Sequence, residues 1–146
     1  MSGYLVDTNV VSAFASGRMA APHLAEWLEA HSDNLFLSVI SIVEIEAGIR
    51  KLQRTGNKAR AELLADWIER ILGAYSERVL AFDLAAGRVA GELSDRARAA
   101  GASPGFADIA IAATAQRYDL MLLTANVRHF QPIGIRYTNP FEALPH

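Results

Sequence analysis

Short apolar runs alternate with longer segments of helical period along this chain. The short runs predict buried strands, because brief apolar stretches bounded by polar residues are typical of strands covered on both faces. They fall at residues 4–6, 35–39, 79–82, 120–123 and 135–137. The longer segments place apolar residues three and four apart and predict helices at 20–30, 41–52, 59–72, 84–100 and from about 104 to 118. Gly101 is a typical helix stop and Pro104 a typical helix start.

This alternation of strands and helices is typical of an α/β protein. We expect a three-layer α/β/α sandwich with a parallel, roughly five-stranded sheet. The 146 residues suit one domain spanning residues 1–146. Ligands of such sheets bind beyond the carboxyl ends of the strands, near the point where the strand order reverses. Residues that follow strands are therefore the first candidates for chemistry.

Three acidic residues occupy such positions. Asp7 directly follows the first predicted strand, Glu44 lies in the first predicted turn after the second strand, and Asp108 lies in the first turn of the last predicted helix. Each has an ordinary structural explanation. Asp7 would cap a first helix, Glu44 would form a capping box with Ser41, and Asp108 would complement a helix dipole. Taken one at a time, these explanations are at least as good as a functional one.

Taken together, the three acids favour a metal site, because all of them fall at the same edge of the predicted sheet. Asp108 is also set in a strongly apolar helix, residues 107–115, where a carboxylate does not serve solubility. Converging carboxylates repel, and burial makes their ionisation more costly. A divalent cation removes that cost. An all-oxygen ligand set in a chain without cysteine favours Mg²⁺, or Mn²⁺, over zinc. Such an ion binds phosphate oxygens and activates water for in-line attack.

Composition limits the partners and the compartment. The chain is 51% hydrophobic, but no run is long enough to span a bilayer and the N-terminus lacks signal-peptide features. We therefore expect a cytoplasmic protein with no membrane partner. Because the net charge is −2, a nucleic acid would have to be met by a local patch. The acid-free stretch 50–60 is one candidate, with Arg50, Lys51 and Arg54. Taken alone, the stretch is better explained by positive side chains that stabilise the C-terminus of a helix and by a solvent-exposed loop.

Four motifs follow one another along the chain. They are a strand followed by Asp7-Thr8-Asn9, Ser-x-x-Glu-x-x-x-Gly at 41–48, Asp-x-x-Ile-Ala-Ala-x-Ala at 108–115, and Leu-Leu-Thr-Ala-Asn-Val-Arg-His-Phe at 122–130. In this order and spacing they resemble the PIN-domain ribonuclease toxins, the VapC-like half of the VapBC type II toxin–antitoxin family. The nearest branch has a late motif Thr-x-Asn-x-x-Asp-Phe and often ends in Asn-Pro, as at 139–140. The resemblance runs from Leu5 to Phe141.

The resemblance implies a Mg²⁺-dependent endoribonuclease that hydrolyses RNA phosphodiesters with metal-activated water. Carried onto this sequence, it makes Asp7, Glu44 and Asp108 catalytic metal ligands, directly or through water. Thr8 or Asn9 would orient the first of these acids. Thr124 and Asn126 would complete the acidic pocket from the end of the late strand.

The late motif departs from the family pattern in this chain. Asn126 stands at one candidate position for a fourth acid, and His129 stands where the branch usually has Asp. A neutral Asn accepts a metal-bound water but supplies no charge, so we expect one well-occupied ion. For His129, a role as a general acid or phosphate contact is open, but an ordinary loop position is favoured.

The resemblance also implies a homodimer with two sites in one groove and a cognate antitoxin whose C-terminal tail covers the site. An arginine of that tail would pair with the carboxylates and displace the metal. Trp67 and Ile68 are candidates for the groove that binds the tail, and equally for the core. Arg50, Lys51 and Arg54 are candidate RNA contacts.

Two alternatives stay open. One is a catalytically weak PIN-like binding module that acts with a DNA-binding antitoxin in operon repression, for which the altered late motif leaves room. The other is a structure-specific DNA nuclease, disfavoured because this compact acidic chain has no room for extra DNA-gripping elements. An aspartate-nucleophile phosphatase needs an acid where Asn9 stands, and a phosphate-loop NTPase needs a Gly-x-x-x-x-Gly-Lys that is absent.

Overall fold

The predicted strands form one parallel sheet. The computed structural model describes residues 3–15 and 22–145. In that part of the chain the five strands, in spatial order β3-β2-β1-β4-β5, are all parallel to their neighbours. Their bounds are β1 Tyr4–Val6, β2 Leu35–Ser38, β3 Val79–Leu80, β4 Met121–Leu123 and β5 Tyr137–Thr138. The predicted α/β class and strand number are therefore confirmed.

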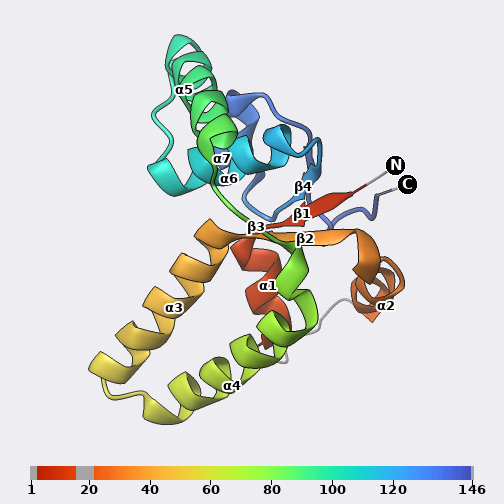
Figure 1. Cartoon of the computed structure of the whole chain (residues 1–146), viewed down its shortest axis with the longest axis vertical. Coiled ribbons are helices and arrows are strands. Elements are labelled where there is room, and N and C mark those ends of the chain that lie inside the picture. Colours follow the sequence, from red (N-terminus) through yellow and green to blue (C-terminus); the bar gives the residue numbers. More distant parts are fainter. Residues whose placement is uncertain (1–2, 16–21, 146) are drawn as a thin grey trace.

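Helices cover both faces of the sheet (Figure 1). One layer consists of α1 Thr8–Ala15, α2 Pro22–Ala30, α3 Val39–Arg54 and α4 Lys58–Tyr75. The other consists of α5 Leu84–Ala99, α6 Phe106–Arg117 and α7 Val127–Phe130. Three short 3₁₀ turns, Ser32–Asn34, Ser76–Arg78 and Gln131–Ile133, join the elements. Residues 20 and 21 of the predicted second helix lie outside the described residues. Within the described residues, no helix has the length and apolar character needed to cross a membrane.

The sheet separates two hydrophobic clusters, because successive side chains of a strand point to opposite faces. Tyr4 and Val6 pack into the cluster under α1 to α4, whereas Leu5, between them, packs against α5 and α6. Trp67 and Ile68 belong to the first cluster, with 9% and 1% of their surface exposed. The core interpretation of these two residues is therefore confirmed, and a groove formed by their neighbours on α4 stays a prediction.

The start of α3 differs from the prediction. Its N-cap is Ser38, which has extended backbone and whose hydroxyl accepts a hydrogen bond from the Ile40 amide at 3.0 Å. The helix thus begins directly where β2 ends, three residues earlier than the capping-box pattern indicated. Ser41 and Glu44 are not a capping box, and Glu44 lies in the second turn.

The flanks of α5 and α6 are also informative. Gly101 has a φ of +81° just after the C-cap of α5, so its predicted role as a helix stop is confirmed. Pro104 does not open the next helix, because Gly105 is the N-cap of α6. Asp83 caps α5 by accepting from the Ala86 amide at 2.8 Å. The unexpected element is α7, which the sequence pattern indicated as a loop.

The strand order reverses beside β1. From β1 the chain passes to β2 and β3 on one side, and it returns to β4 and β5 on the other. The carboxyl ends of β1 and β4 therefore flank the switch point of the sheet, where open α/β sheets bind their ligands. Asp7 follows β1 and Thr124 follows β4, so these two buried residues lie at that edge of the sheet.

Candidate active site

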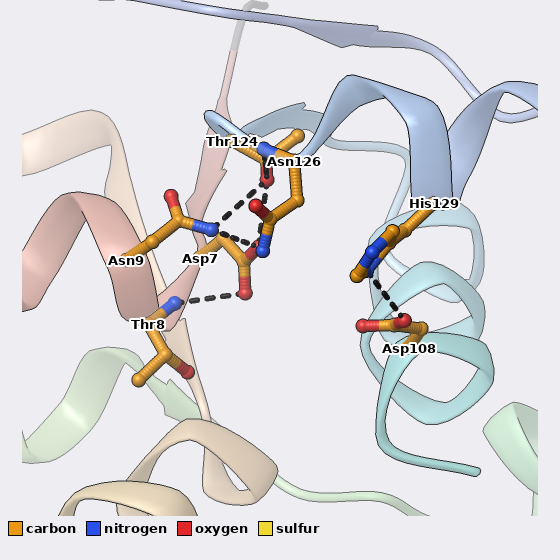
Figure 2. Close-up of polar contacts among 7 residues, drawn as sticks. All are labelled: Asp7, Thr8, Asn9, Asp108, Thr124, Asn126 and His129. Atoms are coloured by element: carbon orange, nitrogen blue, oxygen red, sulfur yellow. Dashed lines mark hydrogen bonds and ion pairs between the residues drawn. The ribbon is translucent and has the colours of Figure 1, made fainter. Parts of the chain in front are cut away.

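Asp7 is a buried carboxylate held by three hydrogen-bond donors. Only 4% of its surface is exposed. Its Oδ1 accepts from the Thr8 amide at 2.8 Å, and its Oδ2 accepts from Asn9 Nδ2 at 3.0 Å and from Thr124 Oγ1 at 2.7 Å. Figure 2 shows these groups gathered around the carboxylate. Because Oδ2 receives two donors and Oδ1 only one, Oδ1 keeps a lone pair for a further partner.

Burial controls the titration of Asp7. Desolvation of the carboxylate raises the pKa of Asp7 above its ordinary value, and the charges of Glu44 and Asp108 raise it further. The hydrogen bonds from Thr124 and from the Thr8 amide act in the opposite direction and lower this pKa. The site therefore holds an acid that is well oriented but costly to ionise without a nearby positive charge.

Glu44 reaches the site from α3 and is linked to the first motif through Thr8. Thr8 Oγ1 lies 2.6 Å from Glu44 Oε1 and 2.9 Å from Ser41 Oγ. Because a carboxylate has no proton to donate, the Thr8 hydroxyl donates to Glu44. The buried Ser41 side chain, 1% exposed, supports this contact from within α3. Thr8 thus orients Asp7 through its amide and Glu44 through its hydroxyl.

Asp108 lies in the first turn of α6, as predicted, and it faces a histidine. His129 Nδ1 is 3.1 Å from Asp108 Oδ2. In Figure 2 the imidazole and the Asp108 carboxylate face each other, across from the Asp7 cluster. His129 is carried by α7 and not by a loop. The contact with Asp108 was not predicted from the sequence, although the place of His129 in the late motif had marked it as a candidate.

Asn9 ties the late motif to the first one, because the Ala125 amide donates to Asn9 Oδ1 at 3.0 Å. Within the late motif, the Asn126 amide donates to Thr124 Oγ1 at 3.0 Å. Asn9 therefore connects the ends of β1 and β4 with both atoms of its side-chain amide. Asn126 itself is exposed beside this cluster. The structure thus brings Thr8, Asn9, Thr124 and Asn126 to the carboxyl edge where Asp7 lies.

The three acids share this edge but do not form a closed ligand set. In the described part of the chain, no three Asp, Glu or His side chains are grouped tightly enough to hold an ion by themselves. Glu44 and Asp108 are nevertheless near enough to Asp7 to raise its pKa. Among residues 3–15 and 22–145, no Lys or Arg forms an ion pair with any of the three. An oxygen-rich site with uncompensated charge and free lone pairs fits a hydrated dication, since Mg²⁺ keeps several waters and needs few carboxylates.

The candidate RNA contacts lie away from these acids. Arg50, Lys51 and Arg54 are exposed on α3, and Lys51 and Arg54 are in its last turn. With a rise of about 1.5 Å per residue, Arg50 is about 9 Å beyond Glu44 along the helix axis and Arg54 about 15 Å. They do not touch the acidic cluster, and they stand on the part of α3 that projects from the sheet in Figure 1.

Two cavities are relevant to the location of the site. One of about 290 Å³ opens beside Asp108 and is also lined by His129, Arg128 and residues of the loop before α6. A larger one of about 410 Å³ lies near α2 and α4, and its lining is mostly apolar with Glu29 as the single carboxylate among the lining residues. The smaller cavity is the better candidate for a reaction site, because Asp108 and His129 line it.

Comparison with known proteins identifies the family. The family model of the PIN domain matches residues 4–134. This chain is 34% identical over 141 residues to the plasmid stability protein StbB of Pseudomonas syringae pv. tomato, covering 95% of this chain and 99% of that protein. The chain therefore belongs to the PIN domain family.

Two further comparisons cover the chain almost end to end. The VapC ribonuclease Y4jK of Sinorhizobium fredii is 32% identical over 139 residues, which are 94% of this chain and 97% of that protein. The crystal structure of FitAcB from Neisseria gonorrhoeae superposes with a TM-score of 0.79 at 26% identity, covering 94% of this chain and 97% of the matched chain. The three-layer fold expected from the sequence is thus the fold of this family.

Proposed function

We propose that this protein is a Mg²⁺-dependent endoribonuclease that hydrolyses RNA phosphodiesters, and that it acts as the toxin of a VapBC-type pair in the cytoplasm. Its membership of the PIN domain family supports this assignment. So does its similarity, over nearly its whole length, to a protein named as a VapC ribonuclease.

One observation carries the metal-dependent part of the proposal. Asp7 is buried at the switch point, beside the charges of Glu44 and Asp108, and the described residues supply no Lys or Arg to neutralise them. Such an arrangement is unfavourable in isolation, and a bound dication converts it into a favourable one. The donors around Asp7 hold its carboxylate in one orientation, as a ligand requires.

Several residues of the chain hold the acidic side chains in position. Thr124, Asn9 and the Thr8 amide orient Asp7, and the Thr8 hydroxyl orients Glu44. Asp108 extends the acidic edge from the other layer of helices. When bound, a divalent ion supplies an activated water and stabilises charge on the phosphate. The cavity of about 290 Å³ beside Asp108 gives the sugar-phosphate chain a place next to that acid, with Arg128 in its lining for the phosphate.

The same acidic edge suits inhibition by a partner. We propose that a cognate antitoxin tail places an arginine against Asp7, Glu44 and Asp108, because a guanidinium offers several donors in a plane to carboxylates that pair with no Lys or Arg of the described residues. We also propose that two copies of the chain associate, as the VapC-like family resemblance implies.

RNA cleavage by the purified, antitoxin-free protein tests the function. We expect cleavage with Mg²⁺, none with EDTA, and a loss on the order of 100-fold in Asp7→Asn, since removing one charge-stabilising group typically costs that much. Asp119→Asn is the matched control. Asp119 is exposed, precedes β4 at the opposite edge of the sheet, and has a φ of 55° that Asn tolerates. Equal cleavage by all proteins would point to a contaminant, and no cleavage across a broad RNA pool would favour the binding-module alternative.

A further inference from the structure

His129 is held in place opposite Asp108 by the packing of α7. Its neighbour Phe130 is fully buried in the cluster formed with α5 and α6, which anchors this four-residue helix against α6. The imidazole is 56% exposed and the Asp108 side chain 27%, so both groups remain open to solvent next to the cavity. The pair is therefore positioned by the core but accessible to a ligand.

The spacing of this pair is that of two ligands on one ion. His129 Nδ1 and Asp108 Oδ2 are 3.1 Å apart. Two adjacent ligands of an octahedral ion, each with a bond of about 2.1 Å, lie about 3 Å apart. An imidazole nitrogen and a carboxylate oxygen at this separation can therefore share a metal ion without a rearrangement of the backbone.

The imidazole of His129 adds a nitrogen donor to an edge otherwise made of oxygen groups, and the neighbouring Asn126 is neutral and adds no charge. A hard ion such as Mg²⁺ depends on oxygen ligands and their charge. Imidazole is a softer ligand that transition-metal ions accept more readily than Mg²⁺ does.

We propose that His129 supplies a nitrogen ligand, together with Asp108, to the ion bound at the acidic edge, and that the site thereby favours Mn²⁺ over Mg²⁺. This inference rests on the proposed function, because it concerns the same metal site.

Electron paramagnetic resonance of Mn²⁺ titrated into the metal-free protein tests the inference directly. We expect bound Mn²⁺ to show electron spin echo modulation from one ¹⁴N nucleus. This signal should disappear in His129→Ala and persist in His23→Ala, a matched control because His23 is exposed on α2, in the other layer of helices. Mn²⁺ bound to the wild-type protein without ¹⁴N coupling would overturn the assignment of His129 while leaving the acidic site intact.

Competition between the two metals tests the stated preference. We expect His129→Ala to weaken Mn²⁺ binding on the order of tenfold and to change Mg²⁺ binding little. His129→Asp should reverse the preference by adding an oxygen ligand and a charge. Asp7→Asn separates this inference from the proposed function, because it should abolish the binding of both ions whatever the role of His129. Wild-type protein that binds neither ion would overturn both proposals, and equal effects of His129→Ala on the two ions would overturn the preference.

Discussion

The hydroxyl of Thr124 gives a quantitative test of how the site holds Asp7. Thr124 is fully buried and donates to Asp7 Oδ2 at 2.7 Å. Its hydroxyl oxygen accepts from the Asn126 amide at 3.0 Å and, more weakly, from Asn9 Nδ2 at 3.3 Å. Thr124→Val keeps the shape of the side chain and removes all three hydrogen bonds. A hydrogen bond to a charged group contributes about 1.5–3 kcal/mol, and an ordinary one about 1 kcal/mol. We therefore expect the free energy of unfolding of the metal-free protein to fall by about 2.5–4 kcal/mol near neutral pH, mostly from the bonds to Asp7 and Asn126.

The pH dependence of this loss identifies its cause. The Thr124 hydrogen bond favours the charged form of Asp7 and so lowers the pKa of Asp7 in the folded protein, against the larger effect of burial, which raises it. The stabilisation that Thr124 provides is present above the folded-state pKa of Asp7 and is lost as pH falls through it. Because that pKa is raised above 3.8, the loss should begin at a higher pH than for an ordinary aspartate.

Thr114→Val is the matched control for this measurement. Thr114 is equally buried, but its hydroxyl donates to the Ala110 carbonyl at 2.8 Å within α6 and touches no carboxylate. We expect a cost of about 1 kcal/mol that does not vary with pH. The assay is urea unfolding with EDTA at a series of pH values from neutral to acid. Parallel pH profiles for the two variants would refute the view that Thr124 acts through the charge of Asp7.

Other measurements address the helix surface, the metal and the basic residues. Gly48 is exposed in α3, and a Cβ added there would meet nothing within 4 Å, so Gly48→Ala should raise the free energy of unfolding by about 0.5–1 kcal/mol in urea unfolding, and no gain would mean a strained helix. Mn²⁺ or Mg²⁺ at about 100 times its Kd should stabilise the wild type by about 2.7 kcal/mol. Calorimetry should find no such gain in Asp7→Asn, and an equal shift in both proteins would indicate non-specific binding. Replacing Arg50, Lys51 and Arg54 with Gln should weaken the binding of uncleaved RNA and reduce its salt dependence. An unchanged salt slope would mean that these side chains are solvated cations only.

Much of the fold could be predicted from local pattern. The first strand, at residues 4–6, was predicted with its true bounds, because a buried strand of a parallel sheet has to be continuously apolar. The errors fell at boundaries. Ser38 and Ser41 are both plausible caps, and the choice between them depends on where β2 stops pairing with β1 and β3. The helix α7 was missed because four residues are too few to show a helical period.

The site could be predicted as a set of positions but not as a set of contacts. Asp7 follows a strand, and the end of a parallel strand is a place for chemistry whatever the rest of the chain does. Glu44 was identified as a candidate site residue, but its alternative explanation, a capping box with Ser41, is wrong because Ser38 is the N-cap of the helix. His129 was identified as a departure from a motif, yet its contact with Asp108 required the docking of α7 on α6.

The sequence by itself determined the alternation of elements, the two-sided burial of the strands, and the placement of Asp7, Glu44 and Asp108 near the ends of elements at one edge. These properties depend on local spacing of apolar and polar residues. Only the tertiary structure decided that Thr124 donates to Asp7 across 117 residues, that Thr8 reaches Glu44 across 36, and that Asp108 meets His129. Such contacts depend on strand order and on the angle at which helices pack on the sheet. Both arise from interactions between residues that lie far apart in the chain.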